Sequence, residues 1–104
     1  MKKTTKIIGN KYLIKLSGEV KGLDSIALSD LLSACKEKDY EEIIIDLQKV
    51  IYMDSNSLGA LVYGKILLDK YNIKITLSAD KKNIDKLFHE CSLEKIFSIV
   101  ESYE

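Results

Sequence analysis

Short apolar runs alternate with helical patterns along the chain, and this alternation limits the fold more than any other feature. Two strand-like runs come first, at residues 4–8 and 12–16, and the turn residues Gly9-Asn10-Lys11 between them predict a hairpin. The later runs that predict strands are residues 42–47, 73–77 and 96–100. A helical pattern precedes each of these later runs. The resulting order, β-β-α-β-α-β-α-β, predicts an α/β fold with a mixed sheet and helices packed mainly on one face.

Three helices are predicted from apolar residues that recur every three or four positions. Asp24 or Ser25 can cap the first helix, and Asp80 can cap the third. The apolar stripes of these two helices are Leu28, Leu31, Leu32 and Cys35, and Ile84, Leu87, Phe88 and Cys91. The second helix, residues 56–70, carries apolar residues on more than one stripe. Such a helix is either deeply buried or keeps a second face for a partner.

Composition restricts the class of protein. The 104 residues predict a single domain, residues 1–104, and 46% hydrophobic residues provide its core. Sixteen basic residues balance sixteen acidic ones, and no local run is strongly basic, so direct binding to nucleic acid is not expected. The sequence lacks an apolar stretch of roughly 18 residues that could span a membrane, and its N-terminus lacks the apolar core of a signal peptide. We therefore expect a cytoplasmic protein without membrane insertion.

The sequence contains no recognisable catalytic machinery. A nucleophile elbow, a phosphate-binding loop and a dinucleotide fingerprint are all absent. The only histidine, His89, falls on the third predicted helix, where a surface or structural role is more common than a catalytic one. Cys35 and Cys91 lie on apolar helix stripes, which predicts buried thiols rather than a disulfide or a metal pair. We expect no enzymatic activity, no metal and no cofactor.

The segment Met53-Asp54-Ser55-Asn56-Ser57-Leu58-Gly59 connects a strand to the second helix. It places Asp54 and Ser55 at a helix N-terminus, where unpaired N–H groups and the helix dipole favour an anion such as a phosphate. Either residue can also simply cap the helix. From the residues alone, the Ser55 hydroxyl is therefore either a cap or a site at which charge is added and removed.

Three motifs, in this order along the chain, resemble those of the STAS domain, the fold of the bacterial anti-sigma factor antagonists. The central family motif is an apolar residue, Asp, Ser, Ser or Thr, Gly, Leu or Ile, Gly, and it corresponds to residues 53–59. An earlier motif, Thr or Ser, Gly, Glu, Leu or Val, Asp, reads here Ser17-Gly18-Glu19-Val20-Lys21. A weaker similarity is Cys91-Ser92-Leu93-Glu94-Lys95-Ile96-Phe97. The resemblance covers essentially the whole chain.

The resemblance implies a mechanism. Ser55 falls on the serine that a partner kinase phosphorylates in the family, and Ser57 is the second choice as acceptor. The kinase, a serine/threonine kinase, is also the anti-sigma factor: unmodified antagonist binds it and releases the sigma factor, and phosphorylated antagonist does not bind. A phosphatase could remove the phosphate. The residues expected to contact the partner are Gly18, Glu19, Lys21, Asp54, Ser55, Asn56, Gly59 and Tyr63.

Three departures from the family pattern bear on this mechanism. Asn56-Ser57 replaces the usual Ser or Thr followed by Gly, and Lys21 replaces an acid on a surface that the family uses for docking. After the last strand there is room for about one turn of a terminal helix at most. Two alternatives stay open. One is a STAS adaptor that phosphate does not switch, such as a subunit of a signalling complex or of a lipid-transport ATPase, and the other is a small enzyme or ligand binder on a similar fold.

Overall fold

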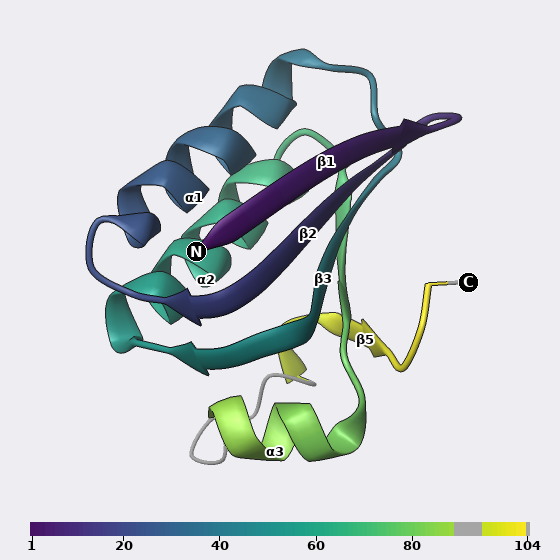
Figure 1. Cartoon of the computed structure of the whole chain (residues 1–104). Coiled ribbons are helices and arrows are strands. Elements are labelled where there is room, and N and C mark those ends of the chain that lie inside the picture. The colour runs from purple at the N-terminus through teal and green to yellow at the C-terminus, as the bar shows by residue number, and fades with distance from the viewer. Residues whose placement is uncertain (89–94, 104) are drawn as a thin grey trace.

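The computed structural model describes residues 1–88 and 95–103 of the chain (Figure 1). Its elements are β1 (Lys2–Ile8), β2 (Lys11–Val20), α1 (Asp24–Ala34), the short 3-10 helix η1 (Cys35–Glu37), β3 (Glu42–Met53), α2 (Ser55–Asp69), β4 (Lys74–Ser78), α3 (Lys81–Phe88) and β5 (Ser98–Val100). The predicted order of strands and helices is confirmed. No helix in the described ranges is long and apolar enough to cross a membrane. His89, expected to be a surface or structural residue, and Cys91, expected to be a buried thiol, lie outside these ranges.

The strands form one mixed sheet in the order β1-β2-β3-β4-β5. β1 is antiparallel to β2, and the pairs β2–β3, β3–β4 and β4–β5 are parallel. The predicted hairpin is confirmed, and Gly9 takes a φ of +61° in its turn, which glycine adopts without steric cost. Residues 101–103 follow β5 without helical structure.

The helices pack on one face of the sheet, where Figure 1 shows α1 and α2 side by side behind the strands. Successive side chains of a strand point to opposite faces, so alternate residues such as Ile14, Ile45 and Leu77 enter this core and are fully buried. α3 contributes the partly buried Ile84 and Leu87 to the same core. The α1 stripe is confirmed, because its residues are buried or packed against the core: Leu28, Leu31, Leu32 and Cys35.

α2 packs closely against α1 at Gly64. A Cβ atom placed on Gly64 would lie 3.1 Å from Leu32 Cβ and nearer still to Leu32 Cδ1. A Cβ atom placed on Gly59, earlier in the same helix, would meet no atom within 4 Å. Gly64 is therefore the close packing point of α2, and Gly59 is an open position on its surface.

β2 and β3 are longer than the sequence predicts. Residues 17–20, expected as part of a loop, belong to β2, and β3 continues past residue 47 to Met53. Two register shifts between these strands, next to Ser17 and Gly18, explain the difference, because each irregularity interrupts the alternation of apolar and polar residues. The extension carries Val50 and Met53 into the core. It also brings the end of β3 directly to the start of α2.

The cap prediction is confirmed for α3 and wrong for α1. The Asp80 carboxylate accepts a hydrogen bond from the Asn83 N–H at 2.8 Å, as an N-cap side chain does. At the start of α1 the N-cap residue is Leu23, and no side chain caps the helix. Asp24 and Ser25 instead form hydrogen bonds with the backbone of the preceding loop. Their polar atoms stabilise the loop that leads from β2 toward the candidate site.

Candidate partner-binding site

Asp54 joins the end of β3 to the start of α2. It is the N-cap residue, with extended backbone angles (φ −84°, ψ 173°), and its Oδ1 accepts a hydrogen bond from the Ser57 N–H at 2.8 Å. Its Oδ2 accepts a second hydrogen bond from the Gly22 N–H at 2.9 Å. One carboxylate therefore caps α2 and holds the loop after β2 beside it. The interpretation of Ser55 as the cap is wrong, because Asp54 fills that position.

The pKa of the Asp54 carboxyl lies below its ordinary value. The largest cause is the hydrogen bond from the Gly22 N–H, and Ser57 is the next. Hydrogen bonds to the ionised form favour that form, so Asp54 carries a negative charge at neutral pH. The Ser57 hydroxyl makes no hydrogen bond of normal geometry in the described part of the chain, although it lies close enough to favour the ionised carboxyl.

Ser55 is the first residue of α2, and its side chain is exposed. The neighbouring Asn56 is exposed as well, whereas the side chain of Ser57 is fully buried. A kinase must reach the hydroxyl that it modifies, and in this structure Ser55 offers its hydroxyl to solvent while Ser57 does not. The N-terminus of α2 also provides unpaired N–H groups and a partial positive charge close to Ser55.

The segment from Gly18 to Lys21 lies beside this junction. β2 and β3 are parallel, and Glu19 pairs with Tyr52 near the end of both strands, so the two strand ends meet at one edge of the sheet. Gly18 has a φ of +80° at one of the register shifts. Lys21 Nζ forms an ion pair with Glu19 Oε2 at 2.6 Å. This contact lowers the pKa of Glu19 and raises that of Lys21. The positive charge of Lys21, which stands where the family pattern has an acid, is therefore balanced by Glu19.

α2 exposes apolar surface close to Ser55. Tyr63 is 58% exposed and Ile66 is 56% exposed, so the second apolar face predicted for this helix is present. A shallow hollow between α1 and α2 is lined by Ser25, Ile26, Ser29, Asn56, Gly59, Ala60 and Tyr63. The hollow brings together three of the predicted contact residues, which are Asn56, Gly59 and Tyr63.

Four exposed apolar residues near this junction were missed in the sequence. Leu23 is 80% exposed and Ile26 is 57% exposed at the start of α1, and both fall outside the apolar stripe of that helix. Their position off the stripe is the signal that could have identified them. Ile51 and Tyr52 are exposed in the part of β3 that the sequence pattern did not predict. In the described residues, no group of three or more side chains is arranged to hold a metal ion.

Comparisons with known proteins identify the family. A model of the STAS domain matches residues 2–104. An anti-sigma-B factor antagonist of Staphylococcus aureus (strain NCTC 8325 / PS 47) is 25% identical over 93 residues, which cover 89% of this chain and 86% of the relative.

Solved structures share the fold. The Thermotoga maritima protein TM1081 aligns with a TM-score of 0.83 at 18% identity, over 97% of this chain and 87% of that one. The anti-sigma factor antagonist SpoIIAA aligns in its unphosphorylated form with a TM-score of 0.76 at 14% identity, over 97% of this chain and 89% of that one. The phosphorylated form of Bacillus SpoIIAA aligns with a TM-score of 0.74 at 16% identity, over 95% of this chain and 91% of that one. With the family match spanning residues 2–104, this chain belongs to the STAS domain family.

Proposed function

We propose that this chain is an anti-sigma factor antagonist: it binds a serine kinase anti-sigma factor, releases the sigma factor, and is switched off by phosphorylation of Ser55. The observation that carries the proposal is the exposed Ser55 side chain at the N-terminus of α2, next to a cap that Asp54 provides. The Staphylococcus aureus relative and SpoIIAA are named as antagonists of anti-sigma factors. The chain is then a binding protein of the cytoplasm rather than an enzyme.

A phosphate on Ser55 is compatible with an intact fold. Because Asp54 caps α2 and bonds to Gly22, modification of Ser55 removes neither of these hydrogen bonds. A phosphate adds a charge of about −1.5 to −2, which the N-terminus of a helix tolerates well. The two forms of SpoIIAA support this reasoning, because they align with this chain at similar TM-scores of 0.76 and 0.74.

The effect of the phosphate is expected at the interface with the partner. Exposed apolar side chains such as Ile26 and Tyr63 provide contact surface near Ser55, and a partner that covers them must also cover the start of α2. A phosphate there would have to lose its water and would add to the negative charge of Asp54. Both effects oppose association, since unpaired charges buried at an interface are costly. The same surface can therefore bind when unmodified and fail to bind when phosphorylated.

The proposal is tested by measuring the mass of the protein after incubation with ATP and the serine kinase anti-sigma factor of the same organism. We expect one phosphate on the wild-type chain, none on Ser55→Ala, and one on Ser57→Ala, because the Ser57 side chain is buried. A phosphatase should restore the original mass. A wild-type chain that binds the kinase but gains no phosphate would indicate an adaptor instead, and phosphate on Ser55→Ala would rule out Ser55 as the acceptor.

A further inference from the structure

The face of the sheet opposite α1 and α2 carries lysines that are dispersed along the sequence. Residues paired across neighbouring strands lie on the same face, together with every second residue of each strand. β1 contributes Lys2, Thr4 and Lys6 to this face. The lysines that the strand register places on it, which we call the lysine face, are Lys2, Lys6, Lys11, Lys15, Lys49 and Lys74.

The lysine face is positively charged although the whole chain has a net charge of zero. Glu42, on the same face, is already ion-paired with Lys11 at 3.2 Å. Asp46 accepts a hydrogen bond from a backbone N–H at 2.9 Å. Among the described residues, no ion pair involves Lys2, Lys6 or Lys49. Their charges are therefore available to an acidic ligand.

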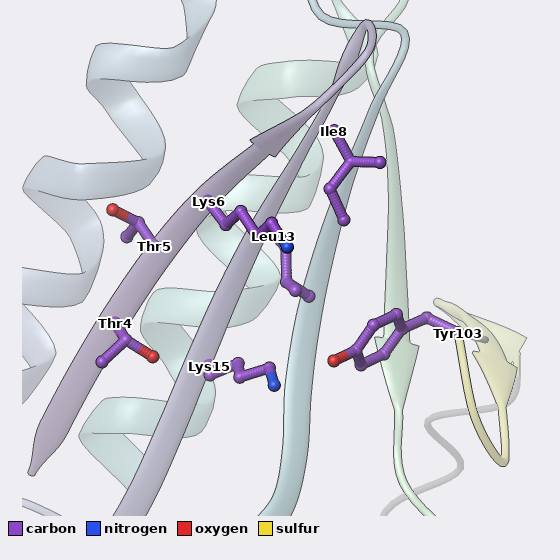
Figure 2. A pocket seen from close by; sticks show the side chains of 7 residues that line it. All are labelled: Thr4, Thr5, Lys6, Ile8, Leu13, Lys15 and Tyr103. Atoms are coloured by element: carbon purple, nitrogen blue, oxygen red, sulfur yellow. The ribbon is translucent and has the colours of Figure 1, made fainter.

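A groove of about 510 Å³ lies on this face (Figure 2). Figure 2 shows that its side chains come from β1, from β2 and from the segment after β5: Thr4, Thr5, Lys6, Ile8, Leu13, Lys15 and Tyr103. Lys15 Nζ lies 5.7 Å from the centroid of the Tyr103 ring, which is a cation–π contact. A second hollow shares Thr4 and Lys15 with this groove and adds Lys2 and Lys49. The two hollows together follow β1 along its length.

β1 is an edge strand of the sheet (Figure 1). It pairs with β2 on one side, and within the described ranges no strand pairs with it on the other. All of its residues are exposed. The backbone N–H and C=O groups along the outer edge can therefore pair with an added strand.

We propose that the lysine face and the outer edge of β1 bind an extended acidic segment of a partner protein. The segment would add a strand to the sheet, and its alternate side chains would point to the lysine face. Lys2 and Lys6 are four residues apart, so acidic side chains at positions i and i+4 of the segment would lie beside them. This site is on the sheet face opposite α1 and α2 and is separate from Ser55.

Other occupants suit the site less well. Single-stranded nucleic acid is usually held by several aromatic side chains that stack on bases, and Tyr103 is the one aromatic residue lining the groove. A membrane surface would require a broad apolar face beside the lysines. β1 does not provide one, because it is mainly polar and its Ile8 side chain is only 43% exposed. A second copy of β1 would place Lys2 and Lys6 against other lysines, which is unfavourable between neighbouring strands.

The test uses a fluorescent acidic peptide with valine between its polar residues and glutamate at positions i and i+4. Binding to the full chain is measured by fluorescence anisotropy at low salt, and contacts are mapped by NMR chemical shifts. We expect saturable binding with the largest shifts in β1 and a strong loss of affinity at about 1 M salt, where the Debye length falls to roughly 3 Å. A peptide of the same composition with glutamate at i and i+3 should bind more weakly, because its acids point to opposite faces.

Two controls separate specific docking from general attraction of charge. Lys2→Glu combined with Lys6→Glu should weaken binding of the peptide about tenfold, because two attractive surface charge pairs become repulsive. Lys81→Glu combined with Lys82→Glu makes the same change in net charge on exposed positions of α3 and should change affinity less than about twofold. A peptide with N-methyl groups at alternate residues should also bind more weakly, since it cannot pair with the edge of β1.

Several results would overturn the proposal. The first is that the peptide does not bind at low salt, and the second is that the two charge-reversal variants lose the same affinity for it. The third is that the peptide with glutamate at i and i+3 binds as tightly as the one with glutamate at i and i+4. The fourth is that N-methylation of the peptide does not change its affinity. Tighter binding of an oligo(dT) strand or of anionic phosphatidylglycerol vesicles than of the peptide would assign the lysine face to a different class of ligand. None of these measurements depends on the kinase, so the site proposed at Ser55 is tested separately.

Discussion

The contact between α1 and α2 gives the sharpest prediction about stability, because the two glycines of α2 have opposite surroundings. Gly64 is buried against Leu32, and a Cβ atom there would lie 3.1 Å from Leu32 Cβ and nearer still to Leu32 Cδ1. Leu32 is itself fully buried and has little room to move away. Gly59 faces open space, with no atom within 4 Å of a Cβ. Alanine should therefore destabilise the chain at residue 64 and stabilise it at residue 59.

The expected magnitudes follow from two opposing effects. Alanine in place of glycine within a helix contributes about 0.8–1.0 kcal/mol of stability. An extra methyl group in a packed core costs about 1–3 kcal/mol. Gly64→Ala should thus lower the free energy of unfolding by about 1 kcal/mol, and Gly59→Ala should raise it by a similar amount. For a domain of about 100 residues, each change corresponds to a shift in Tm of about 4–8 °C, in opposite directions.

Urea unfolding followed by circular dichroism measures both variants against the wild-type chain. A cycle with Leu32→Ala adds a direct test of the contact. Leu32→Ala alone should cost about 2–5 kcal/mol, and adding Gly64→Ala to it should cost nothing further, because the new methyl group then enters the space that the leucine leaves. The reasoning is refuted if Gly64→Ala is at least as stable as the wild type, or if its effect is the same with and without Leu32.

Three further predictions concern single side chains. Ser57→Ala should raise the free energy of unfolding by about 1 kcal/mol in the same assay, because the buried hydroxyl has only a contact of poor geometry with the Asp54 carboxylate in place of its hydrogen bonds to water; lower stability would mean that this contact stabilises the fold. Burial raises the pKa of Glu42, but hydrogen bonds from Thr76 and Lys11 outweigh it and hold the pKa below its ordinary value. The wild-type chain should therefore have a higher free energy of unfolding than Glu42→Gln at neutral pH, and this difference should decline as the pH falls through the folded-state pKa of Glu42; a difference that persists in acid would contradict this. Tyr63→Ala should weaken binding of the kinase by about tenfold or more in calorimetry while Tm stays nearly constant; unchanged affinity would remove Tyr63 from the interface.

Much of the fold follows from local patterns in the sequence. The buried residues of α1 recur with helical spacing, and Asp80 stands just ahead of α3, so these features are visible along the chain. The second half of β3 is not visible in this way. Its register shifts against β2 disturb the alternation of side chains, and only the pairing with a neighbouring strand shows that Val50 and Met53 enter the core.

The candidate site was predicted in part for similar reasons. The sequence places Asp54 and Ser55 at a helix N-terminus, but both residue types can cap a helix, and their roles depend on the position at which the helix begins. The burial of Ser57 likewise depends on which side of α2 faces the sheet. Surfaces formed by several strands are harder still to predict. The lysine face combines residues from four strands, and its charge arises from the register rather than from any run in the sequence.

The most direct test of the proposed switch is the affinity of the serine kinase anti-sigma factor for the chain before and after phosphorylation of Ser55. Isothermal titration calorimetry on the two forms gives this comparison, with circular dichroism as a check that both are folded. We predict tight binding of the unmodified chain and affinity at least about a hundredfold weaker for the phosphorylated chain, because misplaced charge at an interface costs several kcal/mol. Equal affinity of the two folded forms would contradict the account.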